Sequence, residues 1–136
     1  PIPHDPVEHF GYSVPMAWSP NSRRVAFEYI NPTARPEGQH EVIACEVMSR
    51  EHKKLLSASR SYVEMFFVDP DRFVACSYYS LYLLNIRTGA SDALVLREPR
   101  EGSLMMHDFR HVDGFIEYEI GGGSNRSVHR IDISGK

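Results

Sequence analysis

The stretch Leu81–Leu96, LYLLNIRTGASDALVL, decides the fold. In an extended chain, positions 81, 83 and 85 point to one side and positions 82, 84 and 86 to the other, so both faces are largely apolar. Arg87-Thr88-Gly89 forms a turn in which the glycine takes φ > 0 without steric cost, and Ala93–Leu96 returns as a second strand. A hairpin with two apolar faces needs a layer above and a layer below. The stretch therefore predicts a stack of sheets in which this unit is repeated.

The same succession of strands and turns occurs three times, at about residues 14–58, 61–97 and 103–136. Every segment has period two and is bounded by Gly, Pro, Asn, Asp or Ser, which favours strands throughout. The expected strands are Met16–Trp18, Val25–Ile30, Glu41–Met48 and Lys54–Leu56; Val63–Val68, Phe73–Ala75, Leu81–Ile86 and Ala93–Leu96; and Leu104–Phe109, Phe115–Ile120 and Ser127–Ile133. When the second unit is compared with the first, Phe73–Ala75 aligns with Arg24–Ala26. One alternative is a helical turn or two within Glu46–Ser59.

A repeat of roughly 40–50 residues is the span of one four-stranded propeller blade. The fold class predicted is all-β, with antiparallel four-stranded blades of a β-propeller in a single domain of about three blades. The third unit, about 103–136, lacks a fourth strand in the sequence.

Trp18–Phe27, WSPNSRRVAF, resembles the repeat of TolB-like and WD-repeat β-propellers, in which a W/F-S-P-D-G turn precedes a basic residue and an I-A-F strand. Leu81–Leu96 and Val128–Lys136 resemble the end of a WD repeat. The Trp-Asp pair of that repeat is replaced by Leu84-Asn85 and by Ile131-Asp132, so the looser TolB-like class matches better. The resemblance implies a propeller fold and no particular function.

Three blades are fewer than the four to eight of most propellers. A three-blade arc leaves two terminal faces bare, with more exposed apolar surface than a monomer usually carries. Three expectations stay open. The chain pairs with a second copy as a homodimer that completes a six-bladed ring, with residues 6–11 (a strand over Val7–Phe10) completing the third blade; it is a fragment of a longer chain; or it docks against a different protein.

The composition limits the classes of partner. The 136 residues are 42% hydrophobic and 24% charged, with a net charge of −3 and a pI of about 6.2. The basic residues are scattered, which argues against nucleic acid as the partner. No apolar run approaches a membrane helix of about 18 residues and no signal peptide is recognisable, so we expect no membrane partner and a cytoplasmic location. Cys45 and Cys76 lie in apolar segments and are expected to be small buried side chains.

Histidines are the strongest candidates for metal ligands. His107 and His111 are four residues apart, and His4 and His9 lie near the N-terminal end of the sequence. On a strand, however, residues i and i+4 lie about 13 Å apart. Solvent-facing histidines are therefore the favoured interpretation, and no metal site is predicted.

Acidic and glycine-rich turns are the next candidates. Asp69, Asp71, Asp108 and Asp113 are expected in or near turns at one rim, but no calcium-loop pattern surrounds them. Gly121–Ser124 lacks the Gly-Lys-Ser/Thr ending of a phosphate loop and is expected to connect two strands. No Gly-x-Ser-x-Gly motif occurs, so neither catalytic nor cofactor-binding residues are predicted.

The expected function is a non-catalytic protein-interaction or scaffold module that uses blade faces, strand edges and rim loops. The long loop Asn31–Gln39 is the best candidate for a partner-contacting segment, because two strands can be joined without it. Aromatic and arginine patches, Tyr62 with Arg60 and Tyr78-Tyr79 with Arg72, are typical of interaction sites. The predicted partner contacts are Arg35, Glu37, Tyr62, Arg72, Tyr78 and Tyr79.

Two other functions remain open. TolB-like propellers often precede an α/β-hydrolase domain, so the resemblance also implies an accessory propeller piece of a larger hydrolase-type enzyme. The third is a histidine-dependent metalloprotein.

Overall fold

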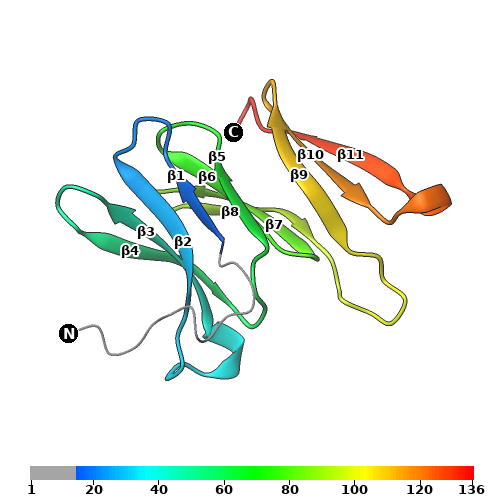
Figure 1. Cartoon of the computed structure of the whole chain (residues 1–136), viewed down its shortest axis with the longest axis horizontal. Helices are drawn as coiled ribbons and strands as arrows, with labels where there is room; N and C mark the ends of the chain where they lie inside the picture. The colour runs from blue at the N-terminus through cyan, green and yellow to red at the C-terminus, as the bar shows by residue number, and fades with distance from the viewer. Residues whose placement is uncertain (1–14) are drawn as a thin grey trace.

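A computed structural model describes residues 15–136 as three antiparallel sheets that stack side by side (Figure 1). The first sheet contains β1 (Met16–Trp18), β2 (Arg24–Ile30), β3 (His40–Glu46) and β4 (His52–Ala58). The middle sheet contains β5 (Glu64–Phe67), β6 (Arg72–Cys76), β7 (Ser80–Asn85) and β8 (Ser91–Leu96). The third sheet contains β9 (Met106–Val112), β10 (Phe115–Ile120) and β11 (Ser127–Asp132), in the order β11-β10-β9.

The predicted all-β class is confirmed, and the arrangement is that of propeller-like blades in an open arc. Within residues 15–136 the only helical segments are two single 3₁₀ turns, η2 (Pro36–Gly38) and η3 (Gly123–Asn125). The helical alternative for Glu46–Ser59 is wrong, because β4 occupies half of that segment and a turn joins it to β3. The described residues contain no helix that is both long and apolar enough to cross a bilayer. The strand predicted within residues 6–11 lies outside the described residues.

Several strand boundaries differ from the prediction by one to three residues, most of all those of β4 and β9. β4 begins two residues earlier and ends two residues later than Lys54–Leu56. β9 runs from Met106 to Val112 and not from Leu104 to Phe109, because the turn that follows it is shorter than the sequence suggested. Asp113 and Gly114 have φ of 48° and 81°, as a two-residue hairpin turn with two left-handed positions requires, and this turn sets the register of β9 on β10.

Both apolar faces of β7, the first strand of Leu81–Leu96, are buried, as predicted. Leu81 and Leu83 join a core cluster with Met106, Phe109 and Ile116 of the third sheet. Leu84, on the other face of β7, joins a second cluster that contains residues of the first sheet. The middle sheet is therefore the shared layer of two cores.

The register reveals which residues of the first two sheets are equivalent. Trp18 pairs with Val25 across β1 and β2, and Phe67 pairs with Phe73 across β5 and β6. The turn before β2 has five residues (19–23) and the turn before β6 has four (68–71). Phe73 is therefore equivalent to Val25, and the sequence alignment of Phe73–Ala75 with Arg24–Ala26 is wrong by one residue.

Arginines at equivalent positions tie the sheets together at one rim. Arg24 binds Glu46 of its own sheet at 2.5 Å, and reaches Asp71 at 2.6 Å and the Pro70 carbonyl at 3.0 Å in the next sheet. Arg72 binds Asp69 at 2.7 Å and donates to the Lys136 carbonyl at 2.9 Å, beyond the third sheet. Arg24 and Arg72 both stand at the first position of the second strand of their sheet, so these links are part of the repeat.

A buried carboxylate fastens the first sheet to the linker that leads to β5. Glu28 on β2 is 5% exposed. Its carboxylate accepts hydrogen bonds from the Tyr62 amide at 2.7 Å and the Ser61 hydroxyl at 3.1 Å, and lies 3.0 Å from Nδ1 of His40. These contacts fix the path of the chain between the two sheets.

Candidate interaction surfaces

The face of the first sheet that points away from the middle sheet is apolar; three of its side chains, Met16, Trp18 and Tyr29, are exposed, and Ile43 at its centre is 6% exposed. We call it the outer face; its members are Met16, Trp18, Val25, Phe27, Tyr29, Ile43 and Cys45. Met16 is 59% exposed and Trp18 is 56% exposed. Over β2, β3 and β4 the face forms an open depression of about 700 Å³. His52 and Lys54 of β4 line its far side.

Residues equivalent to the outer face are buried in the middle sheet. By the strand register, Met16, Trp18 and Val25 correspond to Met65, Phe67 and Phe73. Met65 is 5% exposed and Phe73 is fully buried, and both belong to the core shared with the first sheet. The outer face of the first sheet thus consists of positions whose equivalents in the middle sheet are buried in a sheet-to-sheet interface.

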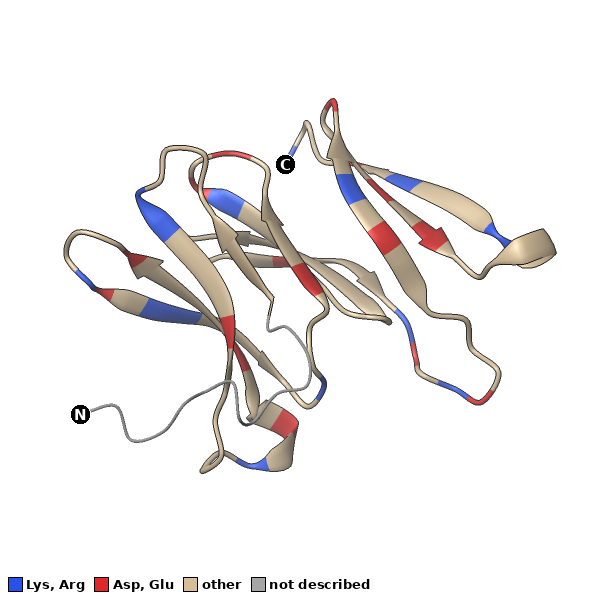
Figure 2. Ribbon diagram, viewed as in Figure 1, with Lys and Arg blue, Asp and Glu red and all other residues tan. Residues whose placement is uncertain are grey.

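The opposite end of the stack has a different character. Val74, Cys76 and Leu83 of the middle sheet face the third sheet and are buried. The equivalent positions of the third sheet are Glu117, Glu119 and Arg130. Three of the four positions that would make the next apolar contact are therefore charged, and the fourth, equivalent to Leu81, is Val128. This pattern is typical of a terminal capping repeat. Figure 2 shows acidic and basic residues side by side on these strands.

We call the face of the third sheet that points away from the middle sheet the terminal face. Its charged side chains form ion pairs with one another. Glu119 is bound by Arg126 at 2.5 and 3.0 Å and by Arg110 at 3.4 Å. Glu117 is bound by Arg110 at 2.8 Å and by Arg130 at 2.7 Å. Two bare apolar faces were expected of a three-blade arc. The outer face of the first sheet is the more apolar of the two, because the third sheet ends the stack with an ion-pair network.

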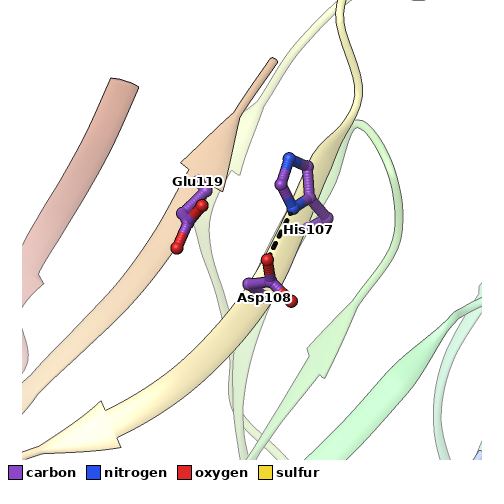
Figure 3. Close-up of side chains that lie close together, drawn as sticks. All are labelled: His107, Asp108 and Glu119. Carbon is purple, nitrogen blue, oxygen red and sulfur yellow. Dashed lines mark hydrogen bonds and ion pairs between the residues drawn. The ribbon is translucent and has the colours of Figure 1, made fainter. Parts of the chain in front are cut away.

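His107, Asp108 and Glu119 converge on the same part of the third sheet (Figure 3), with ligand atoms within 4.8 Å of one another. Nδ1 of His107 lies 2.9 Å from the Asp108 carboxylate and Nε2 lies 2.6 Å from the Gly121 carbonyl. The hydrogen bond to Gly121 and the contact with Asp108 raise the pKa of His107, because both neighbours accept hydrogen bonds from the protonated ring.

Both ring nitrogens of His107 and both carboxylate oxygens of Glu119 already have partners, and Asp108 binds His107 through one of its oxygens. The side chains of Arg110 and Arg126 lie on Glu119 and would repel a bound cation, so the cluster works as part of the ion-pair network. The sequence had grouped His107 with His111, but the structure groups it with residues of the adjacent strand. Asp108 was expected near a turn; it lies inside β9 with φ of 54°, at a bulge where the register with β10 shifts.

The network predicts a specific pH dependence. The hydrogen bonds from Arg126, with the nearby charge of Arg110, lower the pKa of Glu119 from 4.5 to about 2. Because the folded pKa is depressed, the stabilisation is complete above about pH 4.5 and is lost as the pH falls towards 2. We expect Glu119→Gln to unfold with a shallower pH dependence over that window, measured by urea denaturation at a series of pH values. Equal slopes in both proteins would contradict this assignment.

The predicted partner contacts divide into two groups. Arg35 and Glu37 are exposed on and beside η2 in the loop Asn31–Gln39, and Tyr78 is 44% exposed in the β6–β7 turn. Tyr62, by contrast, is 3% exposed and packs in the core between the first two sheets. Burial raises the pKa of its hydroxyl.

The pairs of aromatic and arginine side chains in the structure also differ from the predicted ones. Arg72 is occupied by Asp69 and Lys136 and does not stack on a tyrosine. Arg60 lies over the ring of Tyr79, not beside Tyr62, and Arg97 lies over the same ring. The sequence did not indicate Arg97, because the register that brings it to Tyr79 is set by a backbone hydrogen bond between these two residues.

Neither a protein-family model nor a curated protein matches this sequence. Among solved structures, the fold resembles part of the tricorn protease, with a TM-score of 0.58 and 18% identity over 84% of this chain and 11% of that one. It resembles a putative conserved lipoprotein from Clostridium novyi NT, with a TM-score of 0.59 and 12% identity over 90% and 89% of the two chains. It also resembles Sqt1 from Saccharomyces cerevisiae, with a TM-score of 0.52 and 16% identity over 86% and 31%.

The chain thus spans about a tenth of the length of the tricorn protease and about a third of that of Sqt1. At these identities the likeness concerns the fold alone. Together with the three antiparallel sheets, it places the chain among propeller-like all-β folds.

Proposed function

We propose that the chain is a non-catalytic interaction module whose outer face receives the β-sheet of a partner protein. The observation that carries the proposal is the outer face itself: exposed large apolar side chains at positions that bury an interface in the next sheet. Large exposed apolar surfaces on folded proteins commonly mark interaction sites.

The two internal interfaces indicate the chemistry of the partner. In the first, Met65, Phe73 and Leu84 of the middle sheet pack against the first sheet, whose side of the core consists of Ala17, Ala26, Val42, Ala44, Leu55, Leu56 and Ala58. In the second, Phe109 and Tyr118 of the third sheet share a core with the smaller Val74 and Cys76 of the middle sheet, next to Leu81 and Leu83. Large side chains on one sheet thus fill the space that small ones leave on the other. An apolar sheet face on which several side chains are as small as alanine, valine or cysteine is therefore the surface that the outer face fits.

A second copy fits less well. Two outer faces placed together would oppose large side chains to large ones. The charged terminal face of the third sheet would bury Glu117, Glu119 and their arginines against an apolar surface, and the desolvation cost of such charges is several kcal/mol per ion. A partner protein is therefore favoured over the homodimeric ring.

The edge of β11 supports the same kind of function. β3 and β7 each pair with a fourth strand, β4 and β8, whereas β11 has no such neighbour among the described residues. Its unpaired backbone groups suit the addition of an extended strand from the same partner.

The outer face should bind a hydrophobic dye in the native state. We expect the folded chain to enhance the fluorescence of ANS, and the double variant Met16→Ser, Trp18→Ser to lose most of that enhancement, because these two side chains provide the most exposed apolar surface of the face.

Met48→Ser is the matched control, since Met48 is 91% exposed but lies in the β3–β4 turn, away from the outer face. Dye binding that survives the double variant, or falls equally in Met48→Ser, would contradict the proposal.

The likeness to a segment of the tricorn protease favours one alternative, an accessory propeller piece of a larger hydrolase-type enzyme. In that case the outer face would pack against another part of the enzyme. A reading frame that continues into a domain with a Gly-x-Ser-x-Gly motif, and hydrolase activity of the longer product, would support this alternative.

A further inference from the structure

A cleft at the opposite rim from the Arg24 and Arg72 links brings two arginines to one aromatic ring. The guanidinium carbon of Arg60 lies 6.0 Å from the centre of the Tyr79 ring, and that of Arg97 lies 5.9 Å from it. Arg60 belongs to the β4–β5 linker, Tyr79 to the β6–β7 turn and Arg97 to the segment after β8. Three connections from two sheets therefore form the site.

Both arginines keep donors available. Neither forms an ion pair within residues 15–136. Arg97 donates one hydrogen bond to the Leu104 carbonyl at 2.7 Å, and its amide donates to the Tyr79 carbonyl at 2.8 Å. Arg97 is thus held in place while most of its five N–H groups have no partner among the residues that the structure describes.

A hydroxyl donor joins the arginines. Ser77 Oγ already accepts hydrogen bonds from the amides of Tyr79 and Ser80 at 3.3 and 3.0 Å. Ser77 Oγ also lies 2.6 Å from Ser80 Oγ. Because Ser77 accepts twice, its own proton is best placed on Ser80, which leaves the Ser80 proton free to point towards a ligand.

The space matches a small anionic group on a larger ligand. Arg60, Arg97, Ser80 and Tyr79 line a cavity of about 130 Å³. Tyr62 also lines it, and its buried hydroxyl has no hydrogen-bond partner within the described part of the chain. A second cavity of about 260 Å³ shares Arg60 and Tyr79 with the first and extends to Val63 and Tyr78.

We propose that this cleft binds a carboxylate side chain of an acidic peptide segment, with the residues that flank it in the adjoining cavity. Two guanidinium groups and a hydroxyl are donors suited to a carboxylate, and arginine recognises such groups by charge-assisted hydrogen bonds. The adjoining surface of Tyr78 and Val63 suits an apolar or aromatic neighbour of the acidic residue. This site is chemically distinct from the outer face and does not depend on it.

The probe is a capped tripeptide, acetyl-Ala-Glu-Phe-amide, titrated into the full chain and followed by backbone amide NMR. We expect saturable shifts at Tyr79, Ser80 and Arg97, and binding about tenfold weaker for the same peptide with Gln in place of Glu. The Arg97→Gln and Arg60→Gln variants should each bind the Glu peptide more weakly than the unmodified chain does, by a similar factor. Arg35→Gln, an exposed arginine on another loop, should leave binding unchanged.

Thermal unfolding of each variant establishes that the fold is retained, and Arg60→Gln is the safer test because Arg60 is exposed. Equal binding of the Glu and Gln peptides, or unchanged binding by both Arg variants, would overturn the proposal. Shifts produced by acetate or inorganic phosphate but not strengthened by the peptide would also overturn it, since they indicate an anion site without peptide recognition. Loss of dye binding at the outer face has no bearing on these results.

Discussion

Phe73→Ala is expected to lower the free energy of unfolding by about 3–5 kcal/mol. Phe73 is fully buried between the first two sheets and lies 5.3 Å from the ring of Phe67. Its removal leaves a cavity in the core between the first two sheets, which the surrounding side chains can only partly fill. Urea denaturation followed by far-UV circular dichroism measures the loss.

Trp18→Ala provides the comparison. Trp18 is equivalent to Phe67, the residue that packs beside Phe73, but it is 56% exposed, so the loss should be within about 0.5 kcal/mol. If the two substitutions cost the same, the outer face is covered in solution and the account of a free docking surface is wrong.

Glu28→Ala is the second substitution with a large expected effect, a loss of about 2–4 kcal/mol. It leaves the Tyr62 amide without its acceptor and removes the contacts with Ser61 and His40, all at a buried position. The same denaturation experiment tests it.

Glu28→Gln keeps the shape and one acceptor oxygen, and should lose about half as much. Glu37→Ala, an exposed carboxylate on η2, is the control and should change little. A loss below about 0.5 kcal/mol for Glu28→Ala would show that the linker between the sheets does not depend on this carboxylate.

Much of the fold could be predicted because its signals are local. The alternation in Leu81–Leu96 shows directly that both faces of β7 are apolar, and the structure buries both of them. The turn Gly121–Ser124 joins β10 to β11 as expected. The one-residue error in aligning Phe73 arose because the two turns differ in length, which residue types alone do not reveal.

The interaction surfaces were less predictable because they depend on contacts between distant residues. Tyr62 was expected at the surface, since an aromatic residue beside Arg60 resembles a contact site, but packing against the first sheet buries it. A signal for the outer face was present: large Met16 and Trp18 flank small Ala17, and the charged residues Glu117 and Glu119 stand where the middle sheet has Val74 and Cys76. Only the strand register shows that these positions correspond.

The most direct test of the central claim is site-specific photo-crosslinking from the outer face. A photoreactive p-benzoylphenylalanine replaces Tyr29, which is 47% exposed, and the same group at the turn residue Met48 serves as control. In the cells that naturally produce the chain, we expect an adduct from position 29 and none from position 48. We expect the linked residues of the partner to lie on a β-strand among small side chains. An adduct with a second copy, an adduct within the chain itself, or equal adducts from both positions would contradict the account.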